Sequence, residues 1–142
     1  MTPRELEIKR RTALSESRVT KTVFPFTTNH HNTLFGGTAL AWMDEVSFIA
    51  ATRFCRLPLV TVSSDRIDFK HAIAAGSIVE LVGRVIAVGR TSLKVEVEVF
   101  VESMSQDGRE KAISGVFSFV AIGDDNKPIP VLPDFTLNDA GA

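Results

Sequence analysis

The chain has 142 residues, 44% of them hydrophobic, and 16 basic against 17 acidic residues give a formal net charge of −1. This length suits one domain with a core of its own, and the balanced charge argues against nucleic acid or a membrane surface as a partner. The single cysteine, Cys55, excludes an intrachain disulfide and a thiolate metal cluster.

The sequence shows no sign of export or membrane insertion. No run approaches the roughly 20 apolar residues of a membrane span, and the first residues, MTPRELEIKRR, are charged and contain no apolar signal region. We therefore expect a cytoplasmic protein. We predict a polar leader at 1–17 with at most a helical turn, a single domain at 18–133 and a tail at 134–142. The Pro- and Asp-rich stretch from Asp124 onward should run over the surface.

Two elements are predicted in the first half of the chain. Residues 18–24 (RVTKTVF) are rich in β-branched side chains and stop at Pro25, which is typical of a strand. After a loop over 26–35, apolar residues recur around a long helix from about Gly37 to Phe54, and Pro58 prevents its continuation.

Asp44 stands in the middle of an apolar face of this helix. At about 100° per residue, one face collects Gly37, Leu40, Ala41, Asp44, Phe48, Ala51 and Cys55. The opposite face is apolar as well, so we expect the helix to be buried nearly all round. A buried carboxylate is costly unless it is paired, hydrogen-bonded or functional. Asp44 is therefore the leading candidate for a functional residue.

Four strands are predicted after the helix. The clearest is 93–102, where alternate residues from Leu93 to Val101 are apolar and the residues between them are charged, except Phe100. This alternation indicates one face on a core and one face mostly in water. The other strands are expected at 59–69, with a break or bulge near 63–64, at 77–88 and at 111–122, joined by turns at 72–76, 89–90 and 106–108.

These elements predict an α+β fold, in which one long buried helix is wrapped by a curved antiparallel sheet of five or six strands. Gly83 and Gly115, inside two of the strands, mark bends or close backbone approaches. A helix that is apolar on all sides needs more cover than one sheet face provides. We therefore expect a homo-oligomer, with a dimer as the minimum.

Several segments in this order are similar to the acyl-CoA thioesterase group of the hot-dog fold, which includes the bacterial short-to-medium-chain hydrolases and the brain-type hydrolase. The first is Asn29 with Phe35-Gly36-Gly37, followed in the helix by Met43-Asp44-Glu45. The others are VGRTS at 88–92, VFSFVA at 116–121 and the closing segment 127–133. The resemblance spans roughly residues 18–133. His31 and Asn32 depart from it, since many relatives have asparagine and glycine there, and this bears on chain-length preference.

The resemblance implies hydrolysis of acyl-CoA to a free fatty acid and coenzyme A. It makes the Gly37 amide the donor to the thioester oxygen, Asp44 the general base or the nucleophile of a transient anhydride, and Asn29 a residue that orients water or the carbonyl. Gly37 and Asp44 lie about 10 Å apart along one helix, so they are poorly placed to act on one group. An antiparallel partner helix would bring them together, and the family shares its sites between subunits in this way, often in trimers of dimers.

Two further segments are expected to bind the coenzyme A part of the substrate. By resemblance, Gly89, Arg90, Thr91 and Ser92 hold phosphate in a hairpin turn. Thr61, Val62 and Ser63 would pair with the amides of the pantetheine arm. The sequence contains no phosphate-binding loop, metal-ligand cluster or dinucleotide fingerprint, so no cofactor and no metal are expected.

Alternatives remain for each assignment. Asp44 could be a structural carboxylate paired with Arg66 or Lys70, Asn29 a loop or capping residue, and Gly36-Gly37 a plain helix entry. The whole protein could be a non-catalytic acyl-CoA-binding module or, least favoured, an assembly element without a ligand. A hydratase or dehydratase of the same fold is another alternative, with His30 or His31 as its base.

Overall fold

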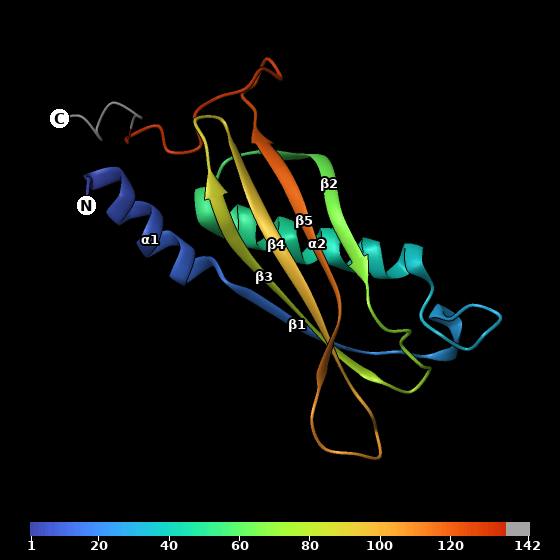
Figure 1. The fold of residues 1–142 in the computed structure, drawn as a ribbon. Coiled ribbons are helices and arrows are strands. Elements are labelled where there is room, and N and C mark those ends of the chain that lie inside the picture. Colours follow the sequence, from blue (N-terminus) through green and yellow to red (C-terminus); the bar gives the residue numbers. More distant parts are fainter. Residues whose placement is uncertain (136–142) are drawn as a thin grey trace.

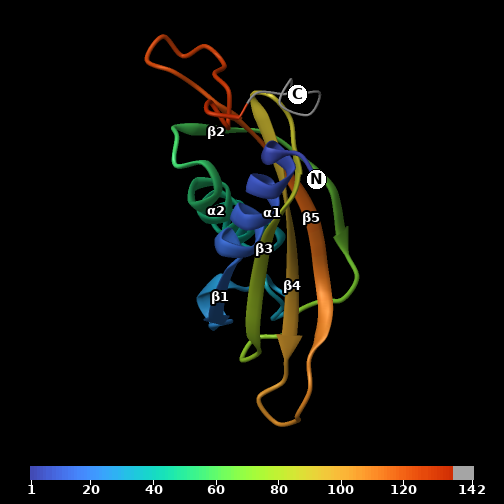
Figure 2. The same ribbon diagram turned by 90° about the vertical axis from the view of Figure 1, so that its left-hand side faces the viewer.

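The computed structural model describes residues 1–135. One helix crosses one face of a five-stranded antiparallel sheet whose strands lie in the order β1-β3-β4-β5-β2 (Figures 1 and 2). The elements are α1 (Pro3–Ser15), β1 (Ser17–Thr22), the 3-10 turn η1 (Pro25–Thr27), α2 (Gly36–Cys55), β2 (Leu59–Phe69), β3 (Ile78–Val88), β4 (Ser92–Glu102) and β5 (Glu110–Ala121). The predicted α+β architecture is confirmed, with five strands. No helix in this part of the chain is long and apolar enough to cross a membrane.

Helix α2 buries only one of its faces. Met43, Val46, Ala50 and Phe54 point into the sheet and are at most 1% exposed. Phe48, on the face that was expected to be buried around Asp44, is 44% exposed. The prediction of a helix buried nearly all round is therefore wrong for a single chain, because the sheet covers one side of it and leaves the other uncovered.

Two glycines let the helix and the sheet approach closely, as predicted. A Cβ at Gly83 on β3 would lie 3.0 Å from Val46 Cγ1 and 3.2 Å from the Val46 carbonyl oxygen. A Cβ at Gly115 on β5 would clash with Ile67 Cδ1 and lie 3.1 Å from Met43 Cε. With a larger residue at either position, these neighbours would have to move.

The strands follow the expected pattern closely. β4 alternates as predicted, with Leu93, Val95 and Val97 at most 1% exposed, while Lys94 faces water. β2 has the predicted bounds and its register shifts twice, between Thr61 and Ser63 and between Asp65 and Asp68. β2 is an edge strand paired only with β5, and nearly all of its residues are exposed. It is therefore an uncovered edge of the sheet, beside α2.

The two ends of the described chain differ from the expectation. Residues 3–15 form a complete helix, closed by a capping box in which Thr2 and Glu5 exchange hydrogen bonds of 3.1 Å, rather than a single turn or a frayed leader. The segment after Asp124 does not only run over the surface, because Val131 and Leu132 are at most 2% exposed and join the core. The predicted tail at 134–142 lies mostly outside the described residues.

Candidate active site

Helix α2 begins without a side-chain cap. Phe35 occupies the N-cap position, and the first helical bond runs from the Ala39 amide to the Phe35 carbonyl at 3.0 Å. The amides before Ala39, including that of Gly37, thus have no partner within the helix and lie at the positive end of its dipole. Gly37 is exposed, and a Cβ at Gly36 would meet no atom within 4 Å. An oxygen that carries developing negative charge can approach these amides.

Asn29 organises the short loop in front of this helix. Its Oδ1 accepts hydrogen bonds from the His31 amide at 2.9 Å, the Thr33 amide at 3.3 Å and the Thr33 hydroxyl at 3.1 Å. Asn29 thus has the loop-forming role considered as an alternative. Within residues 1–135 its side-chain Nδ2 makes no hydrogen bond, so both N–H donors of the amide remain for a ligand.

Asp44 is half-buried and faces β2. The hydroxyl of Thr61 donates to Asp44 Oδ1 at 3.1 Å. Among the described residues, neither Arg66 nor Lys70 forms an ion pair with it, so the structural pairing considered above is wrong. Asp44 does not lie in a buried apolar stripe but at the border of the covered face, where its carboxylate remains within reach of a ligand.

The hairpin from Gly89 to Ser92 joins β3 to β4, as predicted. The side chains of Arg90, Thr91 and Ser92 make no hydrogen bond within the described residues. They are therefore available to bind a ligand. Thr61 and Leu93 are both register partners of Phe119, so β2 and the hairpin end of β4 lie two strands apart, about 10 Å. Val62, at the register shift of β2, is 55% exposed.

The predicted site residues form two clusters in one chain. The Asp44 cluster contains Asp44 with Thr61–Ser63 of β2 and the hairpin 89–92. The Gly37 cluster contains Asn29 and the first turn of α2. Asp44 lies seven residues after Gly37, about 10 Å along the helix axis, and the hairpin lies at the opposite end of β4 from the β4–β5 turn (Figure 1). One chain therefore holds the predicted site residues in two clusters that it does not bring together.

A hollow of about 310 Å³ lies beside the Gly37 cluster. We call it the α2 hollow. Its apolar lining comes from Leu34, Ala39, Phe69, Ile73 and Ile113, and it reaches Gly36 at the start of the helix. An apolar group attached to a carbonyl at the Gly37 amide would find apolar surface here.

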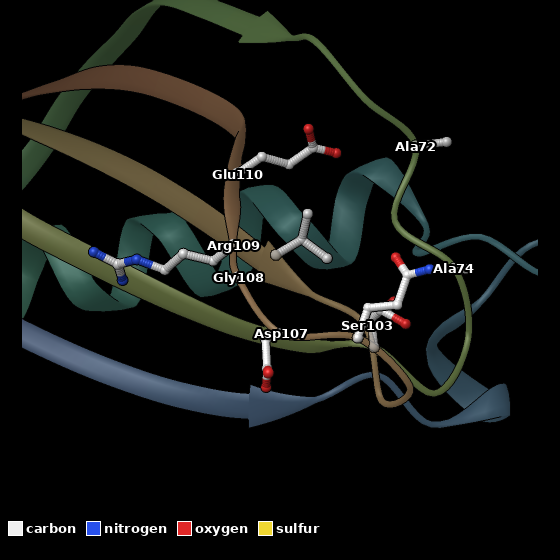
Figure 3. A pocket seen from close by; sticks show the side chains of 10 residues that line it. Ala72, Ala74, Ser103, Asp107, Gly108, Arg109 and Glu110 are labelled. Carbon is white, nitrogen blue, oxygen red and sulfur yellow. The ribbon is translucent and has the colours of Figure 1, made fainter.

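A larger hollow of about 480 Å³ lies between the β4–β5 turn and residues 72–77 (Figure 3). Its lining includes Ser103, Asp107 and Glu110, and none of the predicted site residues. Arg109 also lines it, but its guanidinium lies 4.1 Å from the centre of the Phe100 ring and pairs with Glu80. We do not assign this hollow to the candidate site.

The loop histidines lack the partner that a catalytic imidazole needs. His30 and His31 are both exposed, and their ring centres are 3.9 Å apart. In the described part of the chain neither pairs with a carboxylate; the one histidine–carboxylate pair joins His71 to Glu110 at 4.0 Å. Nor do residues 1–135 contain a group of three His, Cys, Asp or Glu side chains that could hold a metal ion.

Sequence reasoning missed one contact at the hairpin. Arg4, in the first turn of α1, donates from Nη2 to the Gly89 carbonyl oxygen at 2.8 Å and is only 8% exposed. The segment Thr2-Pro3-Arg4-Glu5 carries a capping-box pattern with proline in the first helical turn, which would have predicted a helix start here. The contact with Gly89 itself could not be read from the sequence, because 85 residues separate the two.

Comparison with known proteins assigns this chain to a family. The model of the thioesterase superfamily matches residues 31–107, more than half of the chain. The uncharacterized acyl-CoA thioester hydrolase YkhA of Bacillus subtilis is 42% identical over 118 residues, which cover 82% of this chain and 69% of that protein. The chain therefore belongs to the thioesterase superfamily.

Solved structures of relatives have the same hot-dog fold. The acyl-CoA hydrolase of Bacillus cereus superposes with a TM-score of 0.81 at 39% identity, covering 84% of this chain and 73% of that one. That of Staphylococcus aureus gives 0.80 at 34% with the same coverages, and is described in complex with butyryl coenzyme A, coenzyme A and coenzyme A disulfide. Three more structures of that enzyme carry single alanine substitutions, of an aspartate, a threonine and an asparagine. A hexameric acyl-CoA thioesterase matches at 0.80 and 34%, over 84% of this chain and 76% of that one.

Proposed function

We propose that this protein is an acyl-CoA thioesterase that hydrolyses its substrate at sites shared between two subunits. The observation that carries the shared site is the separation of the two clusters in one chain, each with unused groups that the other lacks. The Asp44 cluster offers a carboxylate that can act as a base, but it lacks the free amides of a helix start that could stabilise an oxyanion. The Gly37 cluster offers amide donors without a base.

The chemistry follows from the groups on each side. The thioester carbonyl would accept from the Gly37 amide and the Asn29 Nδ2 of one subunit, which stabilise the negative charge that develops on oxygen. Asp44 of the other subunit would take a proton from water as the water oxygen attacks the carbonyl carbon. The carbon–sulfur bond then breaks, and the proton passes to the departing coenzyme A thiolate. The free acid and the thiol are the products, and the route requires no metal or cofactor.

A nucleophilic route uses the same groups. The Asp44 carboxylate would attack the carbonyl carbon and expel the thiolate, and water would then hydrolyse the mixed anhydride. The two routes differ in the source of one oxygen. A single turnover in ¹⁸O-labelled water puts label into the Asp44 carboxylate by the nucleophilic route when water attacks the aspartyl carbon, and into the fatty acid alone by the general-base route.

The assignments agree with the substituted residues of the Staphylococcus aureus enzyme. Its asparagine, aspartate and threonine are separated by the same intervals along the chain as Asn29, Asp44 and Thr61. In this protein the second and third are joined by the 3.1 Å hydrogen bond from the Thr61 hydroxyl to Asp44. This agreement supports a role for all three residues in one reaction.

The substrate would extend over both clusters. The α2 hollow supplies apolar surface for the acyl chain next to the Gly37 amide, and its limited volume of about 310 Å³ suits short and medium chains. The hairpin side chains of Arg90, Thr91 and Ser92 would bind the phosphates, and Thr61, Val62 and Ser63 the pantetheine arm. Arg90 contributes a guanidinium, whose planar fork suits phosphate oxygens.

The minimal assembly is a dimer, and we propose a trimer of dimers. The exposed β2 edge and the uncovered side of α2, with Phe48 44% and Val62 55% exposed, are the surfaces that a partner would cover. The neighbour described as a hexamer supports the larger assembly. The predicted cytoplasmic location stays a prediction.

Two alternatives are less well supported. A non-catalytic acyl-CoA sensor would not need a carboxylate held toward the site by Thr61. A hydratase or dehydratase would need a histidine with a partner acid, and the exposed loop pair His30 and His31 has none among residues 1–135.

The test is hydrolysis of a panel of acyl-CoA thioesters, followed by release of free thiol. Asp44→Asn keeps the size of the side chain and removes its basicity, so kcat should fall by about 10²–10⁴-fold. Glu45→Gln, the exposed neighbour on the same helix, is the matched control and should retain wild-type rates. Unchanged hydrolysis by a correctly assembled Asp44→Asn protein would remove the catalytic assignment. Absence of hydrolysis by the wild type, together with tight acyl-CoA binding, would favour the sensor.

A further inference from the structure

The hairpin 89–92 has each of its four carbonyl oxygens bonded within the chain. Gly89 accepts from Arg4 Nη2 at 2.8 Å, and Arg90 from the Val131 amide at 2.9 Å. Thr91 accepts from the Ala121 amide at 3.0 Å, and Ser92 from the Gly89 amide at 2.8 Å. Three other segments thus bind carbonyl oxygens of the hairpin, and the fourth bond closes the hairpin itself. The side-chain groups left for a ligand, namely two hydroxyls and the Arg90 guanidinium, can all donate hydrogen bonds.

This arrangement is what a phosphate seat requires. A phosphate carries negative oxygens that bind donors and are repelled by carbonyl oxygens. Three of the four bonds are made by backbone amides, those of Ala121 in β5, Val131 in the closing segment and Gly89 in the hairpin itself. The fourth is made by a side chain, that of Arg4, and it is the one bond of the set that a substitution can remove without altering the backbone.

Holding Arg4 in this contact is unfavourable for the free energy of folding. It is buried to 8% exposure, and its Nε has no hydrogen-bond partner among the described residues. A buried guanidinium N–H without an acceptor is unfavourable for folding. The Thr2–Glu5 capping box fixes the first turn of α1, from which the long Arg4 side chain reaches the β3–β4 connection. The helix start is thus set to place Arg4 at Gly89.

We propose that Arg4 is a positioning residue for the nucleotide part of coenzyme A. It holds the Gly89 carbonyl away from the phosphates, so that the hairpin presents donors alone, and its own positive charge lies behind the seat. This inference rests on the proposed function only in that coenzyme A is the ligand of the hairpin. Through Arg4, helix α1 would contribute directly to substrate affinity, although it contains none of the reacting groups.

The test compares two thioesters with the same acyl group, one of coenzyme A and one of pantetheine, which lacks the nucleotide. Arg4→Ala should raise the KM for acyl-CoA about tenfold, the loss expected for a hydrogen bond from a charged donor. Its kcat for both substrates and its KM for acyl-pantetheine should stay within twofold of wild type. Arg10→Ala removes the same charge from the exposed side of the same helix, where Arg10 pairs with Glu7, and should leave both KM values unchanged.

Two further variants keep the test decisive if Arg4→Ala does not fold. Arg4→Gln can still donate to the Gly89 carbonyl and should lie closer to wild type, whereas Arg4→Met has similar length without a donor and should show the full rise in KM. An equal rise in KM for both substrates would overturn the proposal, because it indicates a general structural role. No change for either substrate would overturn it as well.

Calorimetry separates this inference from the proposed function. Coenzyme A itself should bind about tenfold more weakly to Arg4→Ala or Arg4→Met than to wild type, and pantetheine equally well to each. This difference would support the role of Arg4 even if the wild type hydrolysed no thioester. If the wild type did not bind coenzyme A, the role of Arg4 would be overturned.

Discussion

The two faces of helix α2 differ in how far one chain completes them. On the sheet side, Met43, Val46 and Ala50 are at most 1% exposed, and Gly83 gives the helix backbone room to touch β3. On the other side Phe48 is 44% exposed, Asp44 has one hydrogen bond to its carboxylate, and Gly37 has an amide without a partner in the helix. The covered face supplies the core of one chain, and the uncovered face carries the predicted site residues, which in our proposal form a complete site only with a second chain.

The largest expected effect concerns the uncovered face. Asn29→Ala and Asp44→Ala should each be nearly inactive alone. After unfolding and refolding as an equal mixture they should regain roughly a quarter of wild-type activity, because half of the dimers are then mixed and each of these has one intact site. Thiol release from acyl-CoA measures the recovery, and each variant refolded alone is the control. Complete absence of recovery in an assembled mixture would show that each active site takes Asn29 and Asp44 from the same chain.

The covered face should respond in stability instead. Met43→Ala leaves a cavity under Gly115 and should lower the free energy of unfolding by about 2–5 kcal/mol, measured by denaturant titration.

Phe48→Asp, on the uncovered face, should weaken the assembly of subunits, and light scattering should detect smaller species than for the wild type. Leu14→Asp is the matched control, because Leu14 is more exposed, at 68%, and lies on α1 at the C-terminal end of α2. Equal loss of assembly in both aspartate variants would argue against the uncovered face as the main contact.

Local sequence patterns predicted the strands well. The period-two alternation of β4 and the bounds of β2 depend on neighbouring residues, and both are as predicted. The burial of α2 was predicted wrongly for a single chain, because both sides of the helix are apolar and periodicity alone cannot tell which side the sheet covers. The close contacts of Gly83 and Gly115 lie on the covered side, but they join segments that are distant in the sequence. Val131 and Leu132 were missed for a similar reason, since a Pro- and Asp-rich stretch conceals two core residues.

The candidate site was predicted as residues but not as contacts. Asp44 was predicted from its place in an apolar stripe of the helix and then from the family resemblance, whereas Asn29 and Gly37 came from the resemblance. Each of the three lies on the expected loop or helix. The hydrogen bond from Thr61 to Asp44 depends on how β2 lies beside α2, and Thr61 had been assigned to the pantetheine arm alone. Such contacts need the register of the sheet, which the sequence does not contain.

Thr61 should have the next largest effect on catalysis. Thr61→Val keeps the shape of the side chain and removes the donor to Asp44, whose carboxylate would then be free to turn. The loss of a hydrogen bond to a charged group corresponds to about a tenfold or larger drop in kcat. Thr20→Val, an exposed position on β1, is the matched control. If Thr61→Val raised KM alone, its role would lie in binding the pantetheine arm and not in orienting the base.

Cys55 should have the smallest effect, because it is a buried thiol at the last residue of α2, away from the reacting groups proposed above. Burial raises the pKa of its thiol above the ordinary value of 9.0, with the nearby Arg11 opposing this in part. The folded state therefore keeps a proton that the unfolded state releases above about pH 9, so stability falls as pH rises beyond that point. Relative to Cys55→Ala, the wild type should lose stability between pH 8 and the pKa of the folded thiol, as measured by urea unfolding. A constant difference in the free energy of unfolding across this range would show that the thiol ionises as readily in the folded as in the unfolded chain. Hydrolysis by Cys55→Ala at neutral pH should match wild type.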